Sequence, residues 1–289
     1  MPSNKNIFLN PMTDMFSLGI AIDKISIKKS DFLTDPQCGG ATEPHRDEGH
    51  TFYILEKGSV TIEIDFQQYE INAPTVVYMH PNQVHRILDF TTMDICSLAV
   101  KNENLNPDYI SFLEELAPAK PLELTNTIST EIFETFSLCL KFSRQNDNKL
   151  YYPLLRDSSN TLIALIISTF LNQNKVSSKA SRTELITRSF KRLLETNYST
   201  IKRPATYAKQ LNISTHYLNE SVKYTTGQTV SQHIQDRIIL EAKRLLYHSD
   251  KSVKEIAFEL GYDDYPYFSR LFNKSTGMSA LTFRNKRYD

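Results

Sequence analysis

Side chains that can donate or accept hydrogen bonds recur along one short segment near the end of the sequence. If residues 265–276 form a helix, its outward face carries hydroxyl, guanidinium, amide and ammonium groups from Tyr265, Ser269, Arg270, Asn273 and Lys274. Arginine can bond guanine at two points, and the other groups bond base edges or phosphates from a helix in the major groove. The chemistry indicated is recognition of double-stranded DNA. The alternative is a small helical bundle whose polar face never meets DNA.

Two helices and a tight turn would present that face. The first helix is predicted over about residues 253–260 by four apolar residues at the spacing of one buried stripe: Val253, Ile256, Ala257 and Leu260. Gly261 allows the turn. Asp263 or Asp264 can cap the second helix, Pro266 fits its first turn, and Gly277 ends it. The residues that the second helix would bury are Phe268, Leu271 and Phe272. These features predict a helix-turn-helix.

The same plan occurs a second time. Residues 204–227 repeat it about fifty positions earlier, with Gly227 in the place of Gly277. Between the two copies, residues 229–249 predict one long helix with an apolar stripe. About 19 residues at 1.5 Å each span roughly 28 Å, close to the ~34 Å between successive major-groove faces on one side of B-DNA. One chain could therefore place two reading helices one turn of DNA apart.

These segments resemble the DNA-binding domain of the AraC/XylS family of bacterial transcription regulators over about residues 183–287. The resemblance rests on both helix-turn-helix units, on the connecting run RIILEAKRLL and on the closing run SVKEIAFELGYDDYPYFSRLFNKSTGMSALTFR. Two positions depart from the family pattern, because Ala280 stands where Pro is usual and Val222 where Phe is usual. We expect looser packing of the first unit around Val222.

The resemblance implies which residues contact bases. In the first reading helix they are His216, Asn219 and Glu220, and in the second they are Tyr265, Pro266, Tyr267, Ser269 and Arg270. Lys223 and Lys274 complete the expected DNA-binding set. Asparagine suits adenine and arginine suits guanine, and a carboxylate can accept from cytosine. Glu220 has an alternative role as a solvated helix residue, because phosphates repel a carboxylate.

Length and composition suit a two-domain protein of the reducing cytoplasm. The chain has 289 residues, of which 40% are hydrophobic, enough for two cores. No apolar run approaches the roughly 18 residues of a membrane-spanning helix, and the first residues lack the pattern of a signal peptide. The three cysteines, Cys38, Cys96 and Cys139, have no metal-ligand spacing and are expected to be reduced thiols.

Charge divides the chain, although the total is zero. Residues 182–289 contain 18 Lys and Arg against 11 Asp and Glu, a net charge of +7, so residues 1–181 carry −7. A basic C-terminal part suits nucleic acid, and an acidic N-terminal part argues that DNA is not its partner.

Residues 17–100 have the pattern of short β-strands, which predicts a small barrel or jelly roll. Gly58 predicts a hairpin turn between strands at residues 52–56 and 59–65. The order EPHRDEGHTFYILEKGSVTIEID, followed by MHPNQVHRI, resembles the cupin-type sensing domain that commonly precedes an AraC-type DNA-binding unit. His45 and His85 stand at positions of histidines in the cupin motifs.

A pocket inside this barrel could bind a small molecule. Strand alternation gives four candidates to line it, His45, Tyr53, Glu63 and His85, although each could equally be a packing or surface residue. Groups suited to a transition metal are present in His45, Glu48, His50, His80 and His85. We expect no metal and no cofactor, because the usual His-x-His pair is missing. His45 and His50 are five apart and would lie on opposite faces of a strand.

Residues 106–174 have a helical pattern, and the run LIALIIST is apolar nearly all round, so the barrel or a second subunit must cover it. By the resemblance, residues 127–172 pair two chains into a homodimer. The expected domains are a sensing and dimerisation domain over residues 1–174, with the barrel at about 17–100, then a linker at 175–182 and a DNA-binding domain at 183–289.

The function expected is that of a cytoplasmic transcription regulator, not an enzyme, whose barrel senses a small molecule and alters DNA binding or dimer arrangement. Its partners would be double-stranded DNA, an effector, a second copy of the chain and RNA polymerase, with no membrane. Sugars are one effector class that the resemblance suggests, beside fatty acids, bile-like amphiphiles and peptides. Two alternatives for the N-terminal part remain: a protein-interaction module, or a metal-dependent cupin enzyme.

Overall fold

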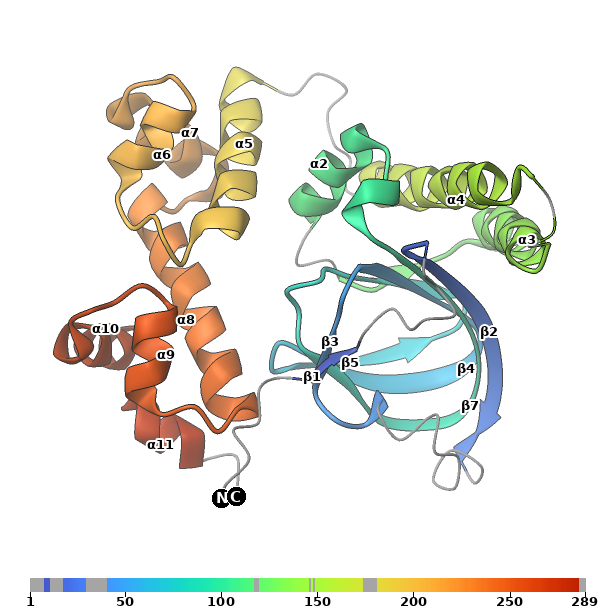
Figure 1. Ribbon diagram of the computed structural model, residues 1–289, viewed down its shortest axis with the longest axis horizontal. Coiled ribbons are helices and arrows are strands. Elements are labelled where there is room, and N and C mark those ends of the chain that lie inside the picture. The colour runs from blue at the N-terminus through green and yellow to red at the C-terminus, as the bar shows by residue number, and fades with distance from the viewer. Residues whose placement is uncertain are drawn as a thin grey trace. The chain divides into compact units, whose positions relative to one another are not determined.

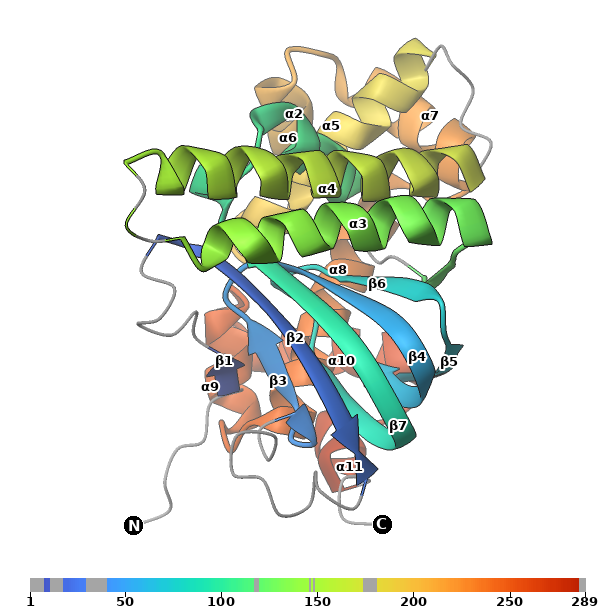
Figure 2. The ribbon, with the colours of Figure 1, turned by 90° about the vertical axis from the view of Figure 1, so that its right-hand side faces the viewer.

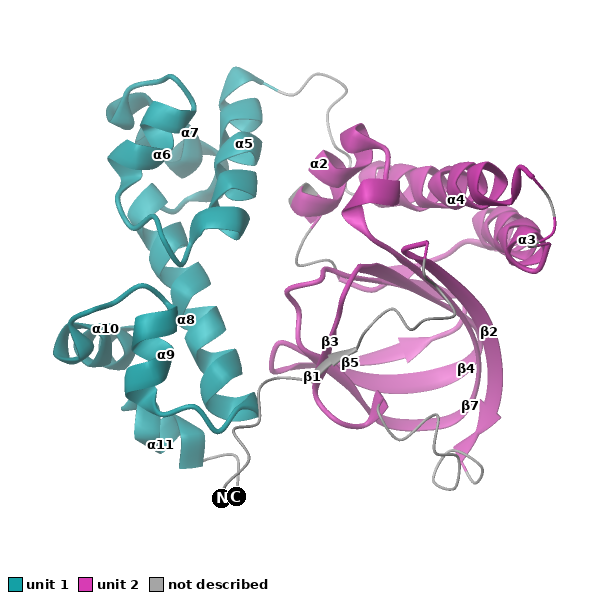
Figure 3. Ribbon diagram, in the orientation of Figure 1, with its two compact units in different colours: residues 1–7, 177–289 teal, residues 8–176 magenta. Residues whose placement is uncertain are grey.

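The computed structural model describes residues 8–10, 18–29, 41–116, 120–145, 147, 149–173 and 181–285 (Figure 1). The chain divides into two compact units, one of residues 8–176 and the other containing residues 177–289 (Figure 3). The first unit is strand-rich with helices after the strands, and the second is helical, which confirms the predicted fold class. Cys38 lies outside the described residues, whereas Cys96 and Cys139 are buried free thiols.

Within the described residues, eight strands of the first unit form one sheet. They are β1 (Phe8–Asn10), β2 (Ile20–Lys28), β3 (His45–Asp47), β4 (His50–Ile64), β5 (Gln67–Asn72), β6 (Thr75–Met79), β7 (His85–Val100) and β8 (Leu122–Glu123). The order is β1-β3-β7-β4-β6-β8, with β2 also on β7 and β5 also on β4. The β1–β3 pair is parallel and the other pairs are antiparallel. The sheet curls around an apolar interior.

The predicted hairpin at Gly58 is wrong, because β4 runs straight through this residue. β4 pairs with β7 from His50 opposite Val100 to Ile64 opposite His85. Gly58 instead lies beside a bulge, with φ at +88°, where a Cβ atom would sit 1.7 Å from the carbonyl oxygen of Thr92. Only glycine fits so close an approach. The hairpin turn comes later and joins β4 to β5.

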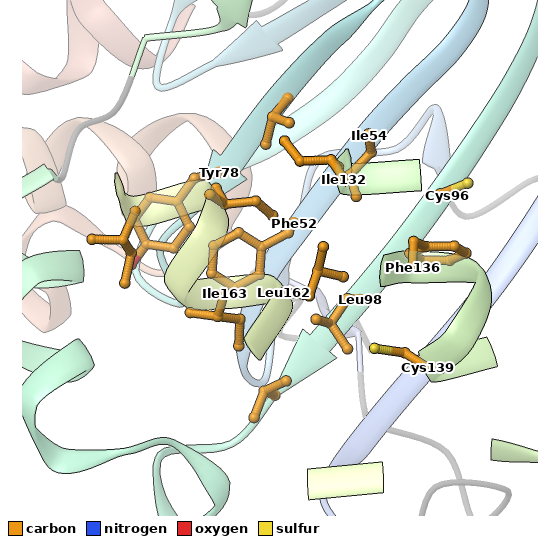
Figure 4. Close-up of a cluster of buried hydrophobic side chains, with 14 of the residues drawn as sticks. Phe52, Ile54, Tyr78, Cys96, Leu98, Ile132, Phe136, Cys139, Leu162 and Ile163 are labelled. Atoms are coloured by element: carbon orange, nitrogen blue, oxygen red, sulfur yellow. The ribbon is translucent and has the colours of Figure 1, made fainter. Parts of the chain in front are cut away.

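The two faces of the sheet have different neighbours. Phe52, Ile54 and Leu98 pack with α3 (Asn126–Ser143) and α4 (Tyr151–Gln173), as Figure 4 shows. Figure 2 shows these two helices side by side across the sheet. Leu55 and Val60 face the opposite way, into a second cluster inside the curl. The alternation of the strand therefore builds one core against helices and another around an interior space.

α4 is the one described helix that is long and apolar enough to cross a membrane by length and composition. Its buried side chains, among them Leu162, Ile163 and Ile166, belong to the same apolar cluster as the sheet and α3. We conclude that its apolar surface serves this core.

A buried histidine ties the sheet to the segments that follow it. The Nδ1 atom of His50 lies 2.7 Å from the hydroxyl of Tyr78, and Nε2 lies 2.8 Å from the side-chain oxygen of Asn102. Asn102 begins the short helix η3 (Asn102–Asn104), which precedes α2 (Pro107–Leu116). The neighbouring His80 faces Glu114 of α2, with Nε2 and Oε2 3.3 Å apart. Burial lowers the pKa of His50 to about 4, so its ring is neutral near pH 7.

The second unit contains both predicted helix-turn-helix pairs. Its helices are α5 (Arg182–Asn197), α6 (Pro204–Gln210), α7 (Thr215–Thr226), α8 (Val230–His248), α9 (Val253–Glu259), α10 (Tyr265–Thr276) and α11 (Ala280–Asn285). α5 begins at Arg182 with Ser181 as its cap in a full capping box, slightly before the expected linker end. The predicted stripe of α8 is buried: Val230, Ile234, Ile238, Ala242 and Leu245.

α8 also buries charges that the apolar pattern does not reveal. Arg237 donates through Nε to Glu195 of α5 at 2.8 Å and through Nη1 to Glu241 at 3.2 Å. Arg244, 2% exposed, donates to the same carboxylate at 3.0 Å. Removing one partner would leave a buried charge uncompensated, which is far costlier than losing a surface pair. These ion pairs fix α8 to α5 in one geometry.

The two helix-turn-helix pairs meet at a close backbone contact. Gly261, in the turn after α9, has φ at +75°, and a Cβ atom there would lie 1.9 Å from the carbonyl oxygen of Ser199. The ammonium group of Lys202 joins the same place, because it donates to carbonyl oxygens of Tyr198, Ser199 and Leu260. One lysine thus ties the segment before α6 to the end of α9.

Replacement of Gly261 by alanine tests this contact. We expect Gly261→Ala to lower the free energy of unfolding by more than about 2 kcal/mol, since it adds a backbone clash to the cost of a left-handed residue. Gly277→Ala is the matched control: its φ is also +75°, but a Cβ atom there meets nothing within 4 Å. The control should lose only about 1–2 kcal/mol. Equal losses in urea titrations would contradict the contact.

The buried His50 predicts a dependence of stability on acid. Its folded pKa of about 4 lies below the ordinary 6.5, so between these pH values the unfolded chain binds a proton that the folded chain does not bind. Stability should fall as the pH drops from 6.5 to 4, by up to roughly 3 kcal/mol from this residue. Groups that titrate in both proteins cancel when the wild type is compared with His50→Gln. The loss over this window should be smaller in the variant, and parallel curves would refute the assignment.

Candidate nucleic-acid interface and cavity

α10 is held with one polar face turned out. Asp264 caps it by accepting from the Tyr267 amide at 3.0 Å, and Gly277 ends it in the left-handed conformation. Its buried residues are Phe268, Leu271 and Phe272, as predicted. The side chains of Arg270, Asn273 and Lys274 are exposed, as are Pro266 and Tyr267, while Tyr265 and Ser269 are half-buried. The ring of Tyr267 stacks on Tyr262 at 5.9 Å between centroids.

α7 has a cap, buried positions and a terminating glycine at the same places as α10, but most of its residues differ. Ser214 caps it, Leu218 and Val222 are buried, and Gly227 ends it. Asn212, with φ at +55°, takes the place in the turn that Gly261 has in the second copy. Asparagine tolerates this conformation better than most residues. The helix-turn-helix plan therefore repeats although few residues are identical in the two copies.

The outward residues of α7 differ in their exposure and in whether they already form hydrogen bonds within the protein. His216, Glu220 and Lys223 are exposed. Asn219 is half-buried and uses its amide within the protein, donating to the Thr215 carbonyl oxygen at 3.1 Å and accepting from the Val230 amide at 3.3 Å. This bond caps the start of α8, so base contact by Asn219 would require the bond to break. The reading roles of these residues stay predictions.

One exposed side chain of α7 was missed by sequence reasoning. Tyr224 is 83% exposed, and fifty positions on, the second copy carries Lys274. A tyrosine hydroxyl can bond a phosphate as a lysine does. Comparison of the two copies position by position was the signal that could have identified it.

A cavity of about 540 Å³, including its open mouth, lies inside the curl of the sheet. Part of this volume is open solvent, so the enclosed space is smaller than the total. Most of its lining is aliphatic, from Ala41, Leu55, Val60, Ile62, Ile71, Val77, Ile87 and Ile95. The polar side chains of the lining are His45, Tyr53 and His85, three of the four predicted candidates. Whether they bind an effector stays a prediction.

The polar end of the cavity is a compact cluster. The rings of His45 and His85 have centroids 4.3 Å apart. Asp47 lies beside them, with Oδ2 3.5 Å from Nε2 of His85, and accepts from the hydroxyl of Tyr53 at 3.2 Å. Burial lowers the pKa of His85 to about 4, and burial beside Asp47 raises the pKa of Tyr53 well above its ordinary value. The cluster therefore presents neutral His85 and a neutral phenol beside the side chain of Asp47.

Asp47 was absent from the predicted site, although a signal for it was available. His45 and Asp47 are two residues apart on β3, so their side chains lie on the same face. The comparison of His45 with His50 missed this pair. His50 and His80 lie instead in the cluster with Tyr78 and α2, and Glu48 pairs with Lys101 at 2.7 Å.

The structure corrects the prediction for Glu63, which does not line the cavity. Its carboxylate pairs with Arg86, with Nε and Oε1 3.2 Å apart. The reason is the bulge: Leu55 lies opposite Ile95 but Lys57 opposite Asp94, so β4 has one extra residue there. An extra residue inverts the alternation of every later side chain. Val60 and Ile62 consequently face inward, and Glu63 faces away.

Comparison with known proteins adds to this geometry. One family model, described as a helix-turn-helix domain, matches residues 207–286, and another, described as an AraC-like ligand binding domain, matches residues 38–88. The chain is similar to the HTH-type transcriptional activator RhaS of Escherichia coli O139:H28 (strain E24377A / ETEC). The two are 24% identical over 274 residues, which cover 89% of this chain and 96% of RhaS.

Two solved structures are also similar to parts or most of the chain. The C-terminal domain of AraT, a response regulator from Geobacillus stearothermophilus, matches with 28% identity and a TM-score of 0.35, covering 37% of this chain and 88% of that one. Unsaturated fatty acid bound wild-type ToxT from Vibrio cholerae strain SCE256 matches with 14% identity and a TM-score of 0.41, covering 92% and 94%.

The two family models fall on the two parts of the chain that the geometry singles out. The ligand-binding model spans β3 to β6, which supply much of the cavity lining, and the helix-turn-helix model spans both reading helices. The match to RhaS runs through both parts. The chain therefore belongs to the AraC/XylS family of transcription regulators, with an N-terminal ligand-binding domain and a C-terminal DNA-binding domain of two helix-turn-helix units.

Proposed function

We propose that the cavity binds a small effector with a mainly apolar body and one polar end, and that this binding changes how the two helix-turn-helix units occupy DNA. The observation that carries the proposal is the lining: among the described residues, eight aliphatic side chains surround a space whose polar side chains are those of His45, Tyr53 and His85. A space that side chains leave open inside the sheet also favours a sensor over a pure protein-interaction module, whose interior would be filled by side chains.

The lining argues against the sugars that the family resemblance suggested. Each hydroxyl group of a sugar loses hydrogen bonds to water when it enters the cavity and needs a protein partner in return. A hydroxyl left without a partner costs about 1–3 kcal/mol, and three polar side chains at one end cannot serve a ring substituted all round. A hydrocarbon or aromatic body meets no such cost against Leu55, Ile62 and Ile71.

The effector can act only by binding two states of the regulator with different affinity. We propose that the two states differ in how two copies of the chain pair through residues 127–172, so that ligand changes which DNA half-sites are filled together. Leu138, on α3, is 46% exposed and supports a contact there. The proposed setting is the cytoplasm, with RNA polymerase as the protein partner at the promoter.

For DNA reading, Arg270 is the residue with the strongest support. It is exposed on α10, and its guanidinium can bond guanine at two points. Lys274, one turn further along, suits a phosphate because its ammonium is a point charge without directional preference. Asn219 has weaker support, since its amide already caps α8.

Alanine substitutions separate the two roles on α10. Against a preferred site selected from a random DNA pool, Arg270→Ala should cost about 1–3 kcal/mol and relax the preference at one base pair. Lys274→Ala should weaken binding to all sequences alike and reduce the salt slope by about one. Binding titrations at several salt concentrations measure both effects. Equal losses on random and preferred DNA would reassign Arg270 to a phosphate.

A matched ligand panel tests the effector class. Thermal unfolding of the full chain would be followed with compounds of similar size that differ in polarity: aliphatic and aromatic molecules with one polar group, and mono- or disaccharides. Binding to the folded state raises the melting temperature in proportion to the logarithm of ligand concentration over Kd. We expect shifts only within the first set. Shifts confined to saccharides would overturn the proposed class.

A further inference from the structure

His85 is buried with polar atoms that the protein leaves unsatisfied. The residue is 3% exposed, and among the described residues no hydrogen bond of good geometry reaches either ring nitrogen, although the Gln83 backbone is close enough to raise the pKa of the ring. Its Nε2 atom is 3.5 Å from Asp47 Oδ2, at the limit of a weak contact. Burying a polar group without a well-formed hydrogen bond is costly, so some other species should contact this ring.

The neighbours of His85 indicate what kind of species could contact its ring. Ligand atoms of His45, Asp47 and His85 all lie within 4.8 Å of one another. The Nδ1 atom of His45 is 2.8 Å from the carbonyl oxygen of Glu43. A carbonyl oxygen can only accept, so Nδ1 carries the proton and Nε2 of the neutral ring keeps its lone pair. Tyr53 donates to Asp47, which holds that carboxylate in place.

These features are the ones that a metal site needs. A metal-binding histidine commonly donates its second ring nitrogen to a backbone carbonyl, and a metal-binding carboxylate is held by a further hydrogen bond. The three side chains offer two imidazoles and one carboxylate, a set suited to Zn²⁺, Fe²⁺ or Ni²⁺ and poor for Mg²⁺ or Ca²⁺.

We propose that His45, Asp47 and His85 bind one divalent transition-metal ion at the polar end of the cavity. Three protein ligands leave at least one coordination position of such an ion open. His45 and His85 both line the cavity, so the open position lies where an effector's polar end would reach. The ion would then join the aliphatic lining in selecting ligands. A sensor without metal would satisfy His85 by an organic donor or by water alone.

The test uses the full chain, stripped with a chelator and titrated with Zn²⁺ against a chromogenic indicator. We expect one ion per chain, and at least a tenfold weaker affinity in both Asp47→Asn and His85→Gln. Glu63→Gln is the matched control, because it removes a carboxylate from the same sheet that points away from the cavity. Its affinity should equal that of the wild type. No binding, or equal affinity in all four proteins, would overturn the site.

A second measurement needs no variant and covers the case in which a variant fails to fold. Cu²⁺ bound to the wild type should show coupling to two imidazole nitrogens in its electron paramagnetic resonance spectrum. A signal from oxygen ligands alone would refute the assignment. The metal proposal and the proposed effector class can fail separately. If the protein binds the metal but no organic ligand, only the proposed sensor function is wrong. If organic ligands raise the melting temperature of metal-free protein and no metal binds, only the metal site is wrong.

Discussion

A single extra residue in β4 decides which side chains of that strand face the cavity. The bulge between Leu55 and Lys57 shifts the alternation of the strand, and Gly58 beside it allows the backbone of β7 to approach. Before the bulge, Tyr53 and Leu55 point inward, and after it Val60 and Ile62 do. Without that shift, Glu63 would enter an apolar interior and the aliphatic lining would face the other way. The side chains that β4 gives to the cavity therefore depend on this bulge.

The DNA-binding domain could be predicted almost completely because its signals are local. Caps, turn residues and the apolar spacing of α9 and α10 lie within a few positions of one another, and the repeat in α6 and α7 checks them. The buried ion pairs of α8 could not be predicted in this way. Arg237, Glu241 and Arg244 have the composition of a solvated face, and only the packing of α5 against them removes the water.

The strand-rich class of the sensor domain could be predicted, but the path of β4 and the orientation of its side chains could not. These features depend on pairing between strands that are distant in the sequence. A glycine between two apolar runs suits a hairpin and a bulge equally well, and the choice depends on Thr92, more than thirty residues away in sequence. Three of the four expected lining residues lie at the cavity, all outside the segment after the bulge. The same alternation argument places Asp47 on the face of His45, but the expected site included only the histidine of this pair.

The connection between the two reading helices has a consequence for the DNA itself. α8 has 19 residues, or roughly 28 Å, and the ion pairs to Glu195 and the ties made by Lys202 oppose its adjustment. One helical turn of straight B-DNA is longer, at about 34 Å. If the length of α8 sets the distance between α7 and α10, a stiff spacer of this length would favour a duplex that curves toward the protein. Operators with pliable pyrimidine–purine steps between the two contacted grooves would gain affinity from base pairs that no side chain touches.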